Sequence, residues 1–405
     1  MTKKTDTPAI RFKGYSDTWE QRKLGELALF NPKDELPQTF EYVDLESVVG
    51  TEMLSHRTEV KSSAPSRAQR LANTGDLFYQ TVRPYQKNNY LFEKPDNNYV
   101  FSTGYAQMRP YVDGYFLLSL VQSERFVKVV LDNCTGTSYP AINANDLAEI
   151  EVAAPSDESE AQKIGAIFRS IDNLITLHQR KYEKLHNIKK SMLEKMFPKN
   201  GSNVPEIRFK GFTEAWEQRK VTEIGKIYIG LVTTMTKHYT DEGTLLIRNS
   251  DIKDGKFEFG DNPIHLEKLF AEKNETRMHQ IGDVITVHTG DVGTSAVITE
   301  NEAKSIGFAT IVTRPNPKII DSNYLCSFLN TDKHKKWAVS ISTGDGRTNY
   351  NLGDYFELVV PVPSIAEQKK IAAYIQNLNR LITLHQRELE KLQNIKKSML
   401  EKMFV

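Results

Sequence analysis

Apolar residues recur at helical spacing in two long stretches of the 405-residue chain. In each stretch they return every seven residues, a second apolar series fills the intervening step, and charged side chains occupy most other positions. This pattern is typical of a helix that pairs with another helix. The heptad positions are Ile164, Ile171, His178, Leu185 and Met192 in the first stretch, and Ile371, Leu378, His385, Leu392 and Met399 in the second.

The two stretches are also nearly identical in sequence. Residues 174–197 and 381–404 differ only as Lys181 against Glu388, Tyr182 against Leu389, and His186 against Gln393. Each predicted helix would have about 40 residues and a length of roughly 60 Å. Neither can bury its apolar stripe alone, so we expect the two to pair. Equivalent halves are usually related by a two-fold axis, which predicts an antiparallel pair.

The histidines in the predicted seam have two interpretations. His178 and His385 occupy heptad positions that are otherwise apolar. A polar residue there can fix the register of a helix pair. Alternatively, each is a partly hydrated histidine where the seam packs loosely, and the sequence leaves both readings open.

A second repeat precedes each half of the chain. Residues 10–27 (IRFKGYSDTWEQRKLGEL) return as residues 207–224 (IRFKGFTEAWEQRKVTEI), an offset of 197, whereas the helices are offset by 207 because 381 minus 174 is 207. We call these two stretches the lead segments. Trp19 and Trp216 are interpreted as packing residues that dock each lead segment on its domain. Residues 198–206, rich in Pro, Gly, Asn and Ser, predict a turn or linker between the halves.

The two middle regions follow the same order of elements with different residues. In the first, residues 42–49, 75–82, 98–103 and 105–110 predict strands, and residues 114–133 predict a helix. In the second, residues 244–252, 282–289, 295–300 and 309–315 predict strands, and residues 323–340 predict a helix. A Thr-Gly loop and a strand then lead into each long helix. A constant frame with two different middles is what a reader of two different short sequences needs.

Composition excludes several classes of protein. The formal net charge of +1 shows no overall basic character, so any DNA affinity must come from local patches or from partners. Cys134 and Cys326 lie in unlike contexts, which predicts a reducing compartment and no zinc site. The N-terminus lacks the apolar segment of a signal peptide, and no apolar run is long enough to cross a bilayer. We therefore expect a soluble, cytoplasmic protein without a metal site.

Motifs for catalysis are missing. The sequence has no phosphate-binding GxxxxGK[ST] loop, no GxSxG elbow, no HExxH, and no NPPY-type tetrapeptide for holding a flipped base. Residues 288–294 (HTGDVGT) suggest an anion-binding nest, but they lie between two strand patterns, which favours a hairpin or bulge. The sequence therefore predicts recognition without catalytic residues.

The repeats and their transitions resemble one family. The order of Thr-Gly loop, strand and long helix, with the words SDESEAQKI at 156–164 and SIAEQKKI at 364–371, is similar to the specificity subunit of type I restriction–modification enzymes. The likeness covers nearly the whole chain. The transitions differ, since Glu160-Ala161-Gln162 stands where the second half has Glu367-Gln368.

The resemblance implies an α+β fold and a non-catalytic role. Two α/β target recognition domains, separated by a pair of long antiparallel coiled-coil helices, would each read half of a split double-stranded DNA site. The limits it suggests are 1–155, 156–198, 199–362 and 363–405, the second and fourth segments being spacer helices. It also implies two modification (methyltransferase) subunits and restriction subunits as partners. They, and not this chain, would hold S-adenosylmethionine, ATP and Mg²⁺.

Candidate DNA contacts lie in the loops of the two middles. Forked and amide side chains read base edges, whereas cations and small donors suit phosphates. The loops at 81–89 and 135–143 are the candidates in the first middle, and those at 233–237, 248–249, 288–294 and 344–350 in the second. The residues that we predict to contact DNA are Arg83, Tyr85, Gln86, Lys87, Thr137, Ser138, Tyr139, Lys237, Arg248, Asn249, His288, Thr289, Arg347, Asn349 and Tyr350.

A rival interpretation comes from a different class of protein. The weak net charge also suits a coiled-coil scaffold whose two α/β modules bind protein or carbohydrate. A DNA-binding assay with and without a modification partner would separate the two.

Overall fold

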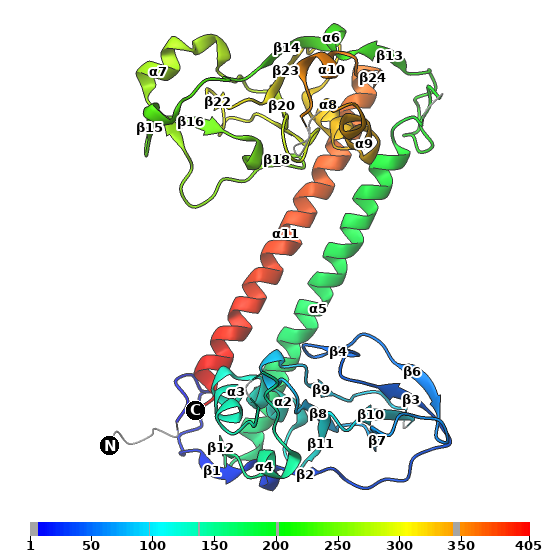
Figure 1. The fold of residues 1–405 in the computed structure, drawn as a ribbon, viewed down its shortest axis with the longest axis vertical. Coiled ribbons are helices and arrows are strands. Elements are labelled where there is room, and N and C mark those ends of the chain that lie inside the picture. The colour runs from blue at the N-terminus through cyan, green and yellow to red at the C-terminus, as the bar shows by residue number, and fades with distance from the viewer. Residues whose placement is uncertain (1–6, 97, 137, 200–201, 343–348) are drawn as a thin grey trace. The chain divides into compact units, whose positions relative to one another are not determined.

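The computed structural model describes residues 7–96, 98–136, 138–199, 202–342 and 349–405 (Figure 1). The chain divides into two compact units, Met1–Gln179 with Arg387–Val405, and Arg180–Gln386. Each unit therefore combines one middle region with parts of both long helices, α5 (Glu158–Lys195) and α11 (Ile365–Met403). The units cut across the four segments suggested by the sequence. Within the described ranges, no helix has the length and hydropathy needed to span a bilayer.

Unit 1 contains two four-stranded sheets. The first has the order β2-β11-β8-β9, formed by Ala28–Phe30, Tyr105–Pro110, Leu77–Gln80 and Tyr90–Leu91. The second has the order β6-β3-β10-β7, formed by Arg57–Val60, Thr39–Val43, Tyr99–Ser102 and Ala68–Leu71. Strands β10 and β3 are parallel, whereas the other neighbours are antiparallel. All four side chains of β8 (LFYQ) are buried, which explains why its large apolar residues follow one another without alternating with polar ones.

Unit 2 repeats this plan. Its first sheet has the order β14-β23-β20-β21, formed by Gly225–Ile229, Ile311–Pro315, Val284–Thr286 and Ser295–Val297. Its second has the order β15-β19-β16-β22, formed by Tyr239–Thr240, His265–Leu266, Thr244–Ile247 and Ile306–Gly307. Here β16 and β22 form the parallel pair. The fold class expected from the sequence is thus confirmed, with two α/β domains and two long helices.

Smaller elements join each lead segment to the base of a long helix. Strand β1 (Glu20–Lys23) pairs with β12 (Glu151–Ala154), and β13 (Glu217–Lys220) pairs with β24 (Val359–Val362), both antiparallel. Each EQRK strand is followed by one helical turn, α1 (Leu24–Leu27) or α6 (Val221–Ile224). The remaining short elements are β4 (Val48–Val49), β5 (Glu52–Met53), β17 (Ile252–Lys253), β18 (Lys256–Phe257), α4 (Ala144–Ala148), α7 (Lys268–Lys273), α10 (Leu352–Phe356), η1 (Pro84–Gln86), η2 (Thr236–His238), η3 (Asn249–Asp251) and η4 (Glu275–Arg277).

The single helix predicted in each middle region is wrong, because the structure has two in each place. Residues 114–133 form α2 (Gly114–Gln122) and α3 (Glu124–Asp132), and residues 323–340 lie in α8 (Ser322–Leu329) and α9 (Asp332–Ile341). Ser123 and Thr331 are extended, and their hydroxyls accept from the amides of Phe126 and His334. Each residue therefore caps the second helix. The Ser-Glu and Thr-Asp pairs were the overlooked signal.

The core of unit 1 is completed from the far end of the sequence. Trp19 packs edge-on against Phe404 at 6.2 Å between ring centroids, and Phe404 lies 5.9 Å from Phe168 at the base of α5. Lys396 of α11 forms an ion pair with Asp172 of α5 (2.6 Å). Phe168 contacts Phe404, and Asp172, which lies later in α5, contacts Lys396, which lies earlier in the chain than Phe404. The two helices therefore run antiparallel in this unit.

Unit 2 has the matching core, built from the end of α5. Trp216 packs edge-on against Phe197 at 6.3 Å, and Phe197 contacts Tyr324 and Phe328 of α8. The interpretation of both tryptophans as packing residues is therefore correct. In both units the buried tryptophan packs against the phenylalanine of the Met-Phe sequence, which explains why both repeats end in that sequence.

Candidate nucleic-acid interface

Two loops of unit 1 that we predicted to contact DNA lie against each other. After β8 the chain turns through Arg83 and Lys87, whose backbones have positive φ angles of 54° and 56°. The amide of Arg83 donates to the carbonyl of Pro140 (2.7 Å), and Val82 bridges to Ala141. Residues 81–89 and the described residues of the loop at 135–136 and 138–143 thus form one surface from two distant stretches of sequence.

Arg83 and Tyr139 form the centre of this surface. The guanidinium carbon of Arg83 lies 4.5 Å from the centroid of the Tyr139 ring, a cation–π contact. The ring is 63% exposed. The fork of a guanidinium matches the O6 and N7 acceptors of guanine, and stacking on an exposed ring limits its rotamers. A role of Arg83 and Tyr139 in base reading stays a prediction.

The neighbouring predicted contacts are not equally free. Tyr85, Gln86 and Ser138 are exposed, although the Gln86 carbonyl already accepts from Gln80 Nε2 (2.8 Å). Lys87 forms an ion pair with Glu124 of α3 (2.7 Å), so its positive charge is partly neutralised within the chain. Thr137 lies outside the described residues.

In unit 2 the same juxtaposition occurs with different side chains. Thr289 bridges to Asn349, and the Thr289 hydroxyl donates to Asn349 Oδ1 (2.9 Å). The His288 amide donates to Asn249 Oδ1 (2.8 Å), and the amide of Tyr350 donates to the His288 carbonyl (2.8 Å). The loops after β20, after β16 and before α10 thus meet at one place, and the first and last of them correspond to the two loops that meet in unit 1. Residues 288–294 connect the antiparallel strands β20 and β21, so the interpretation as a hairpin is correct.

Tyr350 is a correction to the predicted contacts. Its side chain has no exposed surface, and its ring packs among His334, Trp337 and Tyr355. A DNA base cannot reach it while the core is intact. Burial raises the pKa of Tyr350, as expected for a phenol held away from water.

The other predicted contacts in unit 2 differ in their surroundings. Arg248 makes two hydrogen bonds to the carboxylate of Asp251, which raise its pKa and hold its guanidinium on η3. Lys237 is exposed on η2. Arg347 lies outside the described residues.

One neighbouring loop was missed in the sequence. The Asn249 side-chain amide donates to the carbonyls of Phe308 and Ala309, both at 3.4 Å, and Ala309 has a positive φ of 49°. Phe308 is exposed beside the Asn249–His288 contact. Gly307 directly precedes the Phe-Ala pair and is the local signal that could have marked this loop.

The ten predicted pairing residues are all at least partly buried. Ile164, Ile171, Ile371 and Leu378 are buried, and the half-buried ones are His178, Leu185, Met192, His385, Leu392 and Met399. Ile164 contributes to the core of unit 1, and Ile371 and Leu378 to that of unit 2. Their role in pairing stays a prediction.

A buried ion pair anchors each lead segment to the base of a long helix. Arg11 makes two hydrogen bonds to Glu160 (2.6 and 2.7 Å), and Arg208 makes two to Glu367 (2.7 and 2.8 Å). Both carboxylates are almost fully buried, and their bonds raise the pKa of both arginines. Glu160 and Glu367 are therefore equivalent, and the residue that follows is Ala161 in one half and Gln368 in the other. These pairs escaped the sequence analysis, although each residue lies in a repeated word.

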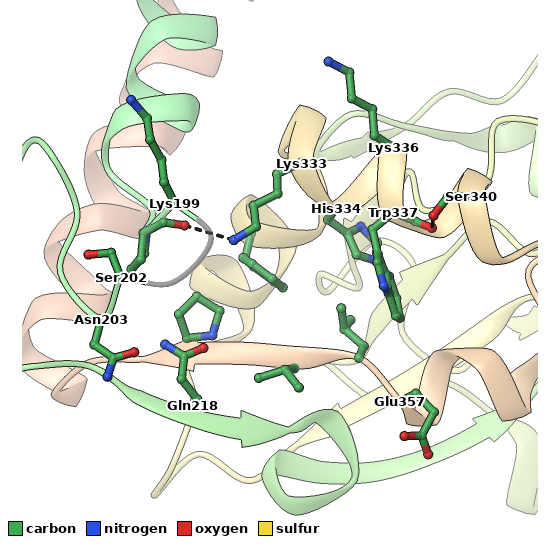
Figure 2. Close-up of a pocket in the computed structure, with 15 residues that line it drawn as sticks. Lys199, Ser202, Asn203, Gln218, Lys333, His334, Lys336, Trp337, Ser340 and Glu357 are labelled. Atoms are coloured by element: carbon green, nitrogen blue, oxygen red, sulfur yellow. Dashed lines mark hydrogen bonds between the residues drawn. The ribbon is translucent and has the colours of Figure 1, made fainter.

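Unit 2 also contains a pocket of about 850 Å³ (Figure 2). Lys199, Lys333, Lys336 and Trp337 line it together with residues of β13 and β24. Lys333 Nζ donates to the carbonyl of Pro198 (3.1 Å), and partial burial lowers the pKa of this lysine. Among the residues predicted to contact DNA, none of those that the structure describes lines this pocket.

Comparison with known proteins gives a consistent result. The family model described as type I restriction modification DNA specificity domain matches residues 16–187 and 213–394. The chain belongs to this family. The two matched segments correspond to the two halves of the internal repeat.

Individual members of the specificity family are distant in sequence. The MjaVIII type I specificity subunit of Methanocaldococcus jannaschii is 23% identical over 302 residues, 71% of this chain and 68% of its own length. The EcoBI specificity subunit of Escherichia coli is 29% identical over 143 residues, 34% of this chain and 29% of its own.

Solved structures show the same fold. The type I restriction–modification S subunit from M. genitalium matches with a TM-score of 0.61 at 15% identity, covering 98% of this chain and 99% of its own. A chain from a study of complex assembly and conformational transition of the type I R-M system matches with a TM-score of 0.52 at 22% identity. That match covers 94% of this chain and 96% of the other.

Proposed function

We propose that this chain is the DNA-recognition subunit of a type I restriction–modification complex and that it reads an interrupted, asymmetric site. One observation carries the proposal. In both units the loop after β8 or β20 lies against the loop that precedes α4 or α10, but the two units present different residues there. Unit 1 presents Arg83 and Tyr139, and unit 2 presents Thr289 and Asn349. A constant frame with different groups suits two different half-sites.

The long helices are proposed to set the spacing between the half-sites. They contain 38 and 39 residues, which corresponds to about 57 Å each. Half-sites on one face of B-DNA lie about 34 Å apart. Inserting four residues after Leu177 should change the number of unspecified bases between the half-sites. Sequencing of methylated sites would measure that number, and an unchanged spacer would disprove the role of the helices.

We further propose that two modification subunits bind the repeated helices. In unit 2 a shallow groove of about 460 Å³ runs along α5 and is lined by Arg180, Glu183, Lys184, Asn187, Ile188, Ser191 and Met192. The same seven residue types return 207 positions later, from Arg387 to Met399. The three substitutions between the copies all fall outside this set. Arg180, Lys184 and Asn187 and their counterparts in α11 are exposed and have no packing reason to be identical, so their repetition favours one kind of partner bound twice.

Catalysis would then reside in the partners. We propose that S-adenosylmethionine, ATP and Mg²⁺ bind to the modification and restriction subunits and that this chain, working in the cytoplasm, contributes recognition only. The purified chain, incubated alone with DNA and S-adenosylmethionine, should transfer no methyl group. The same chain with its modification partner should methylate one bipartite sequence. Methylation by the chain alone would refute the non-catalytic role.

A second function has one observation in its favour. The pocket around Trp337 combines an indole with three lysines, a lining suited to an acidic peptide or a sugar (Figure 2). A scaffold that binds protein or carbohydrate would use such a pocket and would show no sequence-specific DNA binding with or without a modification partner. A DNA-binding assay therefore decides between the two functions.

A further inference from the structure

One helix lysine has a different partner in each unit. In unit 1, Lys396 of α11 pairs with Asp172 of α5. The equivalent positions in unit 2 lie 207 residues away and are Lys189 of α5 and Asn379 of α11. The carboxylate that neutralises the lysine in unit 1 is thus replaced by an amide in unit 2.

Lys189 takes its carboxylate from the recognition domain instead. Lys189 Nζ lies 2.9 Å from Asp254 Oδ2, at the tip of the hairpin formed by β17 and β18. The lysine side chain is only 10% exposed and the Asp254 side chain 44%, so the pair is shielded from solvent on the lysine side. Gly255 beside it has a φ of 77°, and a Cβ there would lie 3.1 Å from Asn379 Nδ2. The hairpin tip therefore contacts both long helices within unit 2.

The same hairpin continues directly into the predicted DNA contacts. Ile252 at its start is buried in the domain core, and the amide of Gly255 donates to the carbonyl of Ser295 (3.0 Å). The preceding residue, Asp251, holds Arg248, and η3 also carries Asn249, which accepts from the His288 amide. Asp254 itself makes the contact with the helix, and it lies only a few residues after the residues of η3 that contact the predicted DNA-binding loops.

The corresponding hairpin of unit 1 has a weaker contact with the helices. There the Thr176 hydroxyl of α5 donates to Glu52 of β5 (3.2 Å) at an exposed position. An exposed ion pair between Arg169 and Glu93 adds to it. Neither contact involves the paired lysine Lys396.

We propose that Asp254 is a positioning residue, which fixes the second recognition domain on the helix pair by taking over the charge of Lys189. This inference rests on the proposed function of the domain as a DNA reader. In unit 1 the lysine joins helix to helix. In unit 2 it joins helix to recognition domain, so this ion pair adds a fixed point for the second reader to the apolar core that α5 and α11 share with the domain.

A double substitution separates the positioning role of Asp254 from the loss of stability that would follow if Lys189 were left without a carboxylate. Asp254→Asn removes the carboxylate from the hairpin, and adding Asn379→Asp supplies one from α11, as Asp172 does in unit 1. The variants would be made in the full chain bound to its modification subunits. Hydrogen exchange of residues 251–259 measures the hairpin contact, and methylated-site sequencing measures recognition. Glu258→Gln, at an exposed carboxylate of the same hairpin, is the matched control.

We expect the double variant to retain the thermal stability of the parent while exchange in the hairpin rises about tenfold. Reading of the second half-site or of the spacer should relax, and the first half-site should be unchanged. Parental exchange and parental recognition in the double variant would overturn the proposal. If the parent complex shows no sequence-specific DNA binding, the proposed function fails, while hairpin exchange still decides whether Asp254 holds the domain.

Discussion

Unit 1 and unit 2 bury the same arginine–glutamate pair at the base of a long helix, but its surroundings differ. In unit 1 the indole of Trp19 donates a third hydrogen bond to Glu160 (3.3 Å). In unit 2 the Trp216 nitrogen has no partner among the described residues. There Gln368 adds bonds instead, accepting from the amide of Asp321 and donating to the carbonyls of Ile319 and Pro363.

This difference shows which contacts define the frame. The ion pair, the tryptophan–phenylalanine contact and the EQRK strand occur twice with nearly equal geometry. The hydrogen bonds around them do not. We infer that the repeated contacts hold the lead segment in place and that the others were free to change, as were the DNA-facing loops.

The largest expected effect comes from removing the arginine of the pair. Arg208→Ala leaves the buried Glu367 without a cation and should destabilise the protein by about 3–5 kcal/mol, as measured by denaturant unfolding. Arg11→Ala should cost less, because Trp19 still donates to Glu160. Arg219→Ala, at an exposed site, is the control. Equal losses for Arg11 and Arg208 would contradict the comparison.

The next largest effect, when measured at pH 5.5, is a pH dependence confined to unit 2. Burial lowers the pKa of His279 and of His334 to about 4, whereas the unfolded residues titrate near 6.5. The unfolded chain therefore takes up protons first as the pH falls. The stability from the two neutral rings is complete above pH 6.5 and is lost between pH 6.5 and 4, at about 1.4 kcal/mol per ring and pH unit.

Hydrogen exchange at pH 7.5 and 5.5, corrected for the intrinsic rate, would test this. Peptides of α8, α9 and β20 should lose protection at the lower pH relative to the core peptides of unit 1. The double variant His279→Gln, His334→Gln should remove most of this pH difference. A loss of protection that is equal in both units would assign the effect to other groups.

A third prediction separates the two readers. Arg83→Ala should weaken binding by about 1–3 kcal/mol and relax one base position in the first half-site only. Arg347→Ala should have the same effect in the second half-site, although Arg347 lies outside the described residues. Methylation-site sequencing of both variants gives the two half-site logos. A change in the wrong half, or no change, would remove the residue from the contacts.

The smallest expected effect concerns the helix breaks. Ser123→Ala and Thr331→Ala each remove an N-cap and should cost about 1 kcal/mol in unfolding free energy. The two losses should be similar, because the caps occupy equivalent positions in the two units. Ser123→Thr and Thr331→Ser keep a hydroxyl that both accepts from the helix amide and donates to a carbonyl, and should retain the stability in both. Losses that differ widely would show that the two helix pairs are not equivalent.

Part of the candidate interface was predictable from the sequence and part was not. Arg83 and Tyr139 stand in loops whose position after a strand and after a Thr-Gly pair indicated a surface role. Tyr350 stands in the same kind of loop but is buried, because its side chain points into the core formed by α8 and α9. The side to which a loop residue points depends on packing between elements, which loop composition does not encode.

The sequence alone determined the two halves, the long helices and the family, because repeats and a seven-residue period are local patterns that survive without knowledge of contacts. Only the tertiary structure decided that the end of α11 completes the core of unit 1 and that Lys189 finds its carboxylate at Asp254. These contacts join residues that are far apart in the chain. They form because buried charges and apolar faces need partners, and the fold decides which partners are near.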